Sequence, residues 1–181
     1  MTLSLLGALA GSVWLMHTSF LNTENVNISQ PTTPDAFMTQ ADYKRFDAQG
    51  NWSGHVQASR VVHYPDQDTS LFDLPKMIFR STNTTTWKVS ANHGTARHGI
   101  SVLHLKDDVV IDKVNAVQGS VLTLHTTTLT TYPQERFAET DQPVTIIQPG
   151  SVVDAVGLTA DMNTGDIHLL SQVKGTYSAR T

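Results

Sequence analysis

A motif that recurs at a fixed spacing limits what this chain can fold into more than any other feature of its sequence. A shift of 68 residues aligns segment 56–65 with segment 124–133, including the Tyr-Pro pair that ends each segment. Weaker copies at half that spacing begin at Val89 and Leu158. Repeats of about 34 residues occur in helical arrays as well as in β-structures, so the periodicity inside each unit decides between them.

Inside each unit, apolar residues alternate with polar ones. Val89 and Ala91, for example, alternate with Lys88 and Ser90. A period of two is typical of a strand with one buried and one solvated face. Turn-forming residues follow in mid-unit, at positions 64–66, 98–99, 132–134 and 163–166. Each unit is therefore predicted to be a β-hairpin, and the small charged fraction of 15% leaves room for abundant Thr and Val, which favour strands.

Four hairpins in sequence, led by a strand at 43–46, predict an all-β domain in which two facing sheets enclose an apolar interior. Such a stack ends in two open edges, one near 43–46 and the other near 173–177. An open edge can pair with an added strand from another chain. A closed sandwich with protected edges is the alternative arrangement of the same strands.

The N-terminal segment has no charged residue before Glu24. As a helix, residues 3–22 would be about 30 Å long, which is enough to cross the hydrocarbon core of a bilayer. This predicts an uncleaved transmembrane anchor at 1–22, a polar spacer at 23–40 and a β-domain at 41–181. A cleaved signal peptide and a buried helix are the two other interpretations of the apolar run.

The composition argues against several classes of function. A net charge of −4 provides no basic surface for a nucleic acid, and the absence of cysteine excludes a thiol nucleophile and a thiolate metal site. Most of the eight histidines fall on the polar sides of predicted strands, and no catalytic or phosphate-binding motif accompanies them. Asp107 and Asp108 are interpreted as a turn or bulge. We therefore predict no catalysis, no metal and no cofactor.

Several short motifs, in their order and spacing, resemble the LptC family, a component of the lipopolysaccharide export bridge of Gram-negative bacteria. The most specific are Tyr43-x-x-Phe46-Asp47-x-x-Gly50-x-Trp52, Trp87-x-Val89-x-Ala91 and Leu170-Ser-x-Val173-x-Gly-Thr-Tyr177. The resemblance covers almost the whole chain. It departs at the N-terminus, where members of the family usually carry basic residues before the anchor.

The resemblance implies an open periplasmic β-jellyroll, held to the inner membrane by one helix and without catalytic activity. The family accepts lipopolysaccharide from an inner-membrane permease pair with its ATPase and passes it to the periplasmic bridge protein LptA. The resemblance further implies that the edge with Tyr43 and Phe46 meets the permease. The opposite edge, with Val173, Gly175 and Tyr177, would receive a strand of the bridge protein.

Two glycines, Gly50 and Gly150, match glycines of the family pattern. They are interpreted as turn positions where a side chain does not fit.

The apolar faces of the predicted sheets offer a path for lipid acyl chains, because each CH₂ group kept out of water is worth about 0.8 kcal/mol. The predicted groove consists of Val56, Ala58, Trp87, Val89, Ala91, Leu103, Leu105, Leu124, Thr126, Leu158 and Ala160. Its small residues, such as Ala58 and Ala91, are expected to leave room between the sheets. Two alternatives remain, an anchored scaffold with a closed β core that binds only proteins, and a binder of another amphiphile such as phospholipid.

Overall fold

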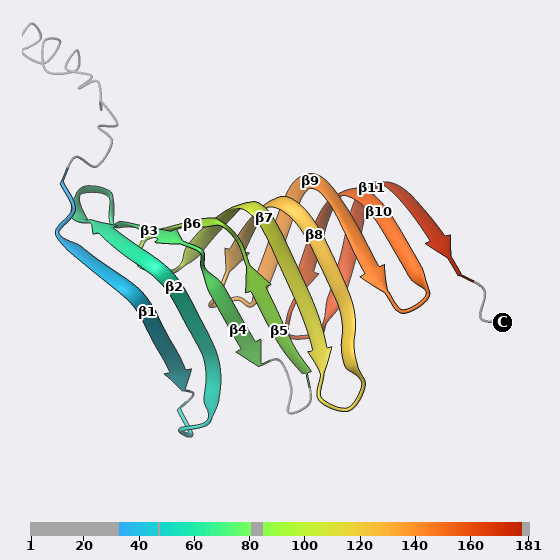
Figure 1. Cartoon of the computed structure of the whole chain (residues 1–181), viewed down its shortest axis with the longest axis horizontal. Coiled ribbons are helices and arrows are strands. Elements are labelled where there is room, and N and C mark those ends of the chain that lie inside the picture. Colours follow the sequence, from blue (N-terminus) through green and yellow to red (C-terminus); the bar gives the residue numbers. More distant parts are fainter. Residues whose placement is uncertain (1–32, 47, 81–84, 179–181) are drawn as a thin grey trace, which may run out of the picture. The chain divides into compact units, whose positions relative to one another are not determined.

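The computed structural model describes residues 33–46, 48–80 and 85–178, which belong to one compact unit, Pro31–Thr181. In this part of the chain, eleven strands form one antiparallel sheet, which confirms the predicted all-β fold (Figure 1). The strands are β1 (Ala36–Phe46), β2 (Trp52–Tyr64), β3 (Thr69–Asp73), β4 (Lys76–Arg80), β5 (Thr85–Ser90), β6 (His93–Arg97), β7 (Val102–Asn115), β8 (Gly119–Tyr132), β9 (Phe137–Gln148), β10 (Ser151–Asp161) and β11 (Asp166–Tyr177). A short 3₁₀ turn, η1 (Pro65–Gln67), joins β2 to β3.

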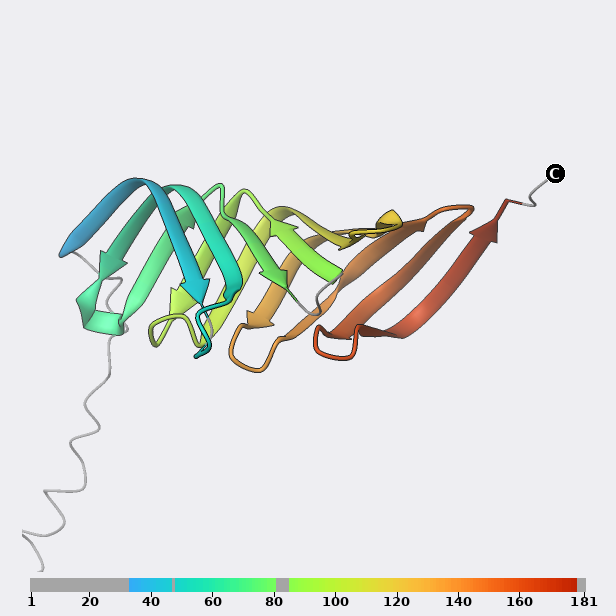
Figure 2. The same ribbon diagram turned by 90° about the horizontal axis from the view of Figure 1, so that it is seen from below.

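The sheet is folded along a crease that crosses its long strands. The first half of β2 pairs with β4 and the second half with β3, while the two halves of β7 pair with β6 and β5. The strand halves therefore form two walls, which we name the β4–β5 wall and the β3–β6 wall after the short strands that each contains. Figure 2 shows the bend in the long strands from a second direction.

Irregular backbone marks the crease. Leu74 lies between β3 and β4 with φ +49°, and Asp107 and Asp108 have φ +63° and +54° in the middle of β7. The pairing of β7 with β8 shifts between Lys106 and Val109 at the same place. An extra residue of this kind bends a strand and increases its local twist. The interpretation of Asp107 and Asp108 as a bulge is confirmed.

The crease also changes the phase in which inward and outward residues alternate along β2. Val56 pairs with Met77, and Val61 pairs with Phe72. Met77 and Phe72 line the same cavity although an odd number of positions separates them. The inward face of β2 therefore carries even-numbered residues before the crease and Val61 after it, while Val62, on the opposite face, is buried as well at 8% exposure.

The first strand begins earlier than expected. The sequence predicted a strand at 43–46 after a spacer that ends at residue 40, whereas β1 starts at Ala36 and pairs with the whole length of β2. The predicted anchor at 1–22 and most of the spacer lie outside the described residues. Among those that are described, no helix has the length and apolarity to cross a membrane.

Candidate functional site

A row of inward residues runs along the β4–β5 wall and crosses nine strands without a charged side chain. Each member is the cross-strand partner of the next, so the row is continuous from the first strand to the last. Its members, in order from β1 to β11, are Tyr43, Val56, Met77, Val89, Ile111, Leu124, Ile146, Val153 and Gly175. We call it the apolar row.

Small side chains lie beside the apolar row, next to the crease. Ala41 pairs with Ala58 in β1 and β2, and Thr126 pairs with Val144 in β8 and β9. The hydroxyl of Thr126 donates a hydrogen bond to the carbonyl of Pro143 at 3.0 Å, so that a polar residue is accommodated in the interior. Ala58 and Thr126, two of the predicted groove residues, thus lie next to the crease.

The β3–β6 wall supplies the facing side. Leu105 and Leu158 are 1% and 0% exposed, and they belong to the same buried cluster as Val89 and Leu124 of the opposite wall. Gly94 lies beneath Leu105, since an added Cβ would stand 3.3 Å from its side chain. The two walls are therefore in close contact over the middle of the sheet.

An apolar cavity of about 260 Å³ remains open at the β1 end of the interior. It is larger than the engineered cavity of about 150 Å³ that accommodates benzene in another protein. Most of its walls are apolar side chains from both sides of the fold, with Arg45 and His55 near its rim. The apolar lining residues include Tyr43, Val56, Phe72, Pro75, Met77, Phe79, Ile100, Leu103 and Pro133.

The predicted groove residues divide between this cavity and the packed interior. Val56 and Leu103 line the cavity. The remaining nine are buried: Ala58, Trp87, Val89, Ala91, Leu105, Leu124, Thr126, Leu158 and Ala160. The structure thus brings all eleven to the interior, most of them packed against one another.

Several cavity residues were not among the predicted groove residues. Phe72, Met77 and Phe79 belong to β3 and β4. Tyr43 was predicted as an edge residue and lines the cavity as well. Tyr43 is linked to the predicted groove through its cross-strand pairing with Val56. This pairing can be recognised only when the register of β1 on β2 is known.

Both predicted docking edges lie in edge strands. Of the described strands, β1 pairs only with β2 and β11 only with β10. Tyr43 and Phe46 are 59% and 57% exposed in β1, and Val173 and Tyr177 are 57% and 76% exposed in β11. Gly175 lies between the last two and pairs with Val153.

Two histidine–aspartate contacts join β2 to the N-terminal edge of the sheet, one through Asp42 of β1 and one through Asp35, which precedes β1. His63 Nδ1 lies 2.7 Å from a carboxylate oxygen of Asp35, and His55 Nε2 lies 2.8 Å from one of Asp42. Hydrogen bonds that the His63 ring donates to Asp35, and then to Asp68, raise the pKa of His63 above its usual 6.5. Hydrogen bonds from Gln57 and then His55 lower the pKa of Asp42 below its usual 3.8.

The two predicted turn glycines are required for their backbone conformation. Gly50 and Gly150 both have φ +80°. An added Cβ would meet nothing within 4 Å at Gly50, and only the carbonyl oxygen of Ser178 at 3.9 Å at Gly150. The expectation that a side chain does not fit is therefore wrong in its reason, because space is free and the left-handed conformation is the constraint.

Metal-ligating side chains do not gather at this site. Within residues 33–46, 48–80 and 85–178, no three His, Asp or Glu side chains are placed to hold a metal ion together.

One antiparallel sheet folded at a crease, with an apolar interior and two free edge strands, defines this protein as an open β-jellyroll. A family model described as "Lipopolysaccharide-assembly, LptC-related" matches residues 1–178. The chain belongs to that family, as its motifs predicted, and membership supports a part in lipopolysaccharide transport. A search of curated proteins returned no match.

Among solved structures, the fold is similar to the crystal structure of LptH, the LptA-homologous periplasmic component of the lipopolysaccharide transport device of Pseudomonas aeruginosa. The two share 11% sequence identity over 70% of this chain and 95% of the other, with a TM-score of 0.54. At this level of sequence identity, the similarity shows only that the two proteins share a fold.

Proposed function

We propose that this protein carries lipopolysaccharide from the inner-membrane permease pair and its ATPase to the periplasmic bridge protein LptA, and holds the lipid A acyl chains between its two walls. The apolar row carries the proposal, because it is continuous from edge strand to edge strand. A lipid moving along it keeps its CH₂ groups out of water at every step, each worth about 0.8 kcal/mol.

The ends of the apolar row coincide with the proposed docking edges. Tyr43 lies in β1 and Gly175 in β11, the two strands with a free edge. If the permease jellyroll adds to β1 and the bridge protein adds to β11, the neighbouring sheet would extend the row of apolar side chains across each joint. The proposed anchor at 1–22 would hold the β1 end at the inner membrane, with the jellyroll in the periplasm.

The packing between the walls favours a second candidate, a scaffold with a closed β core that binds only proteins. Trp87, Leu105 and Leu158 are almost completely buried without a ligand. Under our proposal the walls must separate when lipid enters, whereas under the scaffold hypothesis they never do. A binder of phospholipid would use the same apolar row and differs only in the lipid that it carries.

Photocrosslinking in cells from single positions distinguishes these functions. Val89 and Leu105 point into the interior, and the neighbouring Lys88 and His104 point to the opposite face as matched controls. We expect lipopolysaccharide adducts at Val89 and Leu105 and none at the two controls. Adducts at none of the four, in a folded and anchored protein, would support the scaffold, and phospholipid adducts in place of lipopolysaccharide would identify the other amphiphile.

A further inference from the structure

A second cross-strand row lies beside the apolar row, at the rim of the β4–β5 wall. Its members, each paired with the next, are Arg45, Gly54, Phe79, Trp87, Lys113 and Leu122. Arg45 and Lys113 are the two charged residues of this row. The apolar interior of the wall is thus bordered at its mouth by two aromatic side chains with a cation on each side.

Lys113 reaches across the mouth to the opposite wall. Its ammonium donates a hydrogen bond to the carbonyl oxygen of Gly165, in the turn between β10 and β11, at 3.2 Å. It also lies over the ring of Trp87, 5.1 Å from the ring centroid. The turn is shaped for this contact, because an added Cβ at Gly165 would stand only 2.8 Å from the ammonium nitrogen.

The partners of Lys113 leave its charge without a counter-ion. Among the described residues, no carboxylate lies within 4.0 Å of its ammonium, which contacts a neutral carbonyl and an aromatic face. The attraction between two opposite charges in contact exceeds that between an ammonium and a neutral carbonyl, and it grows where water is excluded. An anionic oxygen brought to the mouth would therefore be a better partner than the Gly165 carbonyl.

We propose that Lys113 binds the phosphate of an acylated glycolipid whose chains occupy the interior, and exchanges the Gly165 carbonyl for it. This inference rests on the proposed function. The exchange releases the contact between the two walls at the moment that the lipid is held, so binding the head group and opening the mouth become one event. The adjacent Trp87 is 1% exposed, and among the described residues its indole Nε1 has no hydrogen-bond partner. It separates the cation from the apolar row below.

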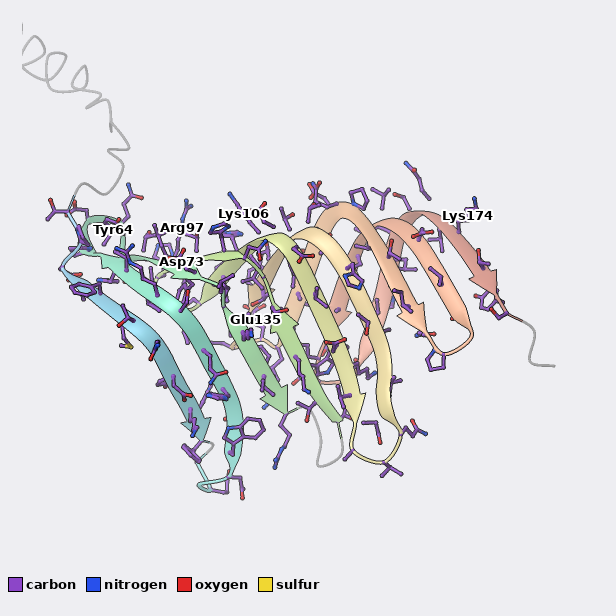
Figure 3. The ribbon with its side chains drawn as sticks, in the orientation of Figure 1. Tyr64, Asp73, Arg97, Lys106, Glu135 and Lys174 are labelled. Carbon is purple, nitrogen blue, oxygen red and sulfur yellow. The ribbon has the colours of Figure 1, made fainter. Side chains whose placement is uncertain are left out.

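The test compares two lipids and four forms of the full chain, reconstituted in nanodiscs. The probes are lipopolysaccharide and the same lipopolysaccharide after enzymatic removal of its phosphates, with inorganic phosphate as a third arm. The variants are Lys113→Gln, Lys113→Arg and, as a matched control, Lys106→Gln, which removes an exposed lysine of the same strand (Figure 3).

We expect Lys113→Gln to weaken binding of the phosphorylated lipid roughly tenfold and to leave the dephosphorylated lipid unaffected. Lys113→Arg should retain most of the affinity, and Lys106→Gln should match the wild type. Inorganic phosphate alone should bind too weakly to compete, since the chains supply most of the affinity. If Lys113→Gln lost affinity equally for both lipids, or for neither, the role of Lys113 in phosphate binding would be overturned. If Lys113→Gln bound both lipids more tightly, Lys113 would only hold the two walls together through Gly165. If neither lipid binds the wild type, the proposed function itself fails.

Discussion

Gly157 shows how much one residue contributes to the crease. It lies where β10 crosses from one wall to the other, with φ +77°. An added Cβ would stand 2.9 Å from Leu170 Cδ1 and 3.2 Å from its Cβ, in the neighbouring strand β11. We expect Gly157→Ala to lower the free energy of unfolding by about 2–3 kcal/mol, of which about 1–2 kcal/mol comes from the left-handed backbone. Urea denaturation of the variant measures the loss.

Gly50→Ala is the matched control for backbone strain. Gly50 has φ +80° with nothing within 4 Å of an added Cβ, so its loss should be about 1–2 kcal/mol. The double change Gly157→Ala with Leu170→Ala should recover part of the difference, since it removes two of the three close atoms. Equal losses at Gly50 and Gly157 would show that the contact with Leu170 contributes nothing.

Single residues also show what the sequence could and could not predict about the site. The alternation around Val89 and Leu124 placed both in the interior, because strand periodicity depends only on neighbouring residues. Phe72 was missed because the crease shifts the alternation by one position, and this shift comes from Leu74 with φ +49° rather than from any turn motif. None of the sequence motifs includes Lys113. Its cross-strand pairing with Trp87 places it on the inner face of the sheet.

Among the elements, β2 is joined through His63 to Asp35, which precedes β1, and to Asp68, which precedes β3. Because the pKa of His63 is raised in the folded state, its contacts with Asp35 and Asp68 stabilise the protein fully below pH 6.5. The contribution is lost as the pH rises above 6.5 through the folded-state pKa. We expect unfolding temperatures to fall from pH 6 to pH 8, and to fall less in His63→Gln, when measured by calorimetry at both pH values.

His125→Gln is the control for this pH dependence, since His125 is exposed in β8 far from β1 in the strand order. It should change with pH as the wild type does. Asp42 acts in the opposite direction: its lowered pKa adds stability above pH 3.8 that is lost as the pH falls below this value. A His63→Gln variant with an unaltered difference between pH 6 and pH 8 would contradict the assignment to His63.

The other edge strand, β11, provides a test of partner docking. Val173 is 57% exposed, so Val173→Glu should alter stability by no more than about 0.5 kcal/mol. The added charge on the edge should weaken binding of an LptA-type bridge protein at least tenfold, since it must be desolvated when a strand is added. Lys88→Glu, on the exposed face of the central strand β5, should leave binding intact. Surface plasmon resonance with both variants would detect the reverse ranking, which would exclude β11 as the docking edge.

The sequence predicted the order of the strands and the turns between them, but it did not predict the crease that bends the long strands. The four mid-unit turns follow from Gly, Pro and Asn signals, and the structure has a turn at each of them. The crease depends instead on pairing between strands that are not consecutive, such as β3 with β6 and β5 with β7. No local signal in β2 shows that its two halves pair with different strands.

At the scale of the whole molecule, the uneven packing of the interior would give lipid movement a direction under the proposed function. The cavity is open at the β1 end, while the interior from β5 to β10 is packed. Filling an existing cavity requires no separation of the walls, whereas occupying the packed part does. Lipid is therefore expected to enter beside β1, where the permease would dock, and to reach Val89 and Leu124 only after the mouth has opened.

A side chain that fills the cavity should block this route. Val56→Trp places a bulky group in the space between Met77 and Phe72, at a cost of about 1–3 kcal/mol if the neighbours must shift. We expect lipopolysaccharide adducts at Val89 to fall several-fold in cells, while the protein remains folded and membrane-associated. Lys88→Trp, an equally large change on the exposed face, should leave adducts at the wild-type level. If Val56→Trp reduced no adducts, lipid would have to enter elsewhere along the mouth, and the cavity would be no more than the loosely packed end of the sheet.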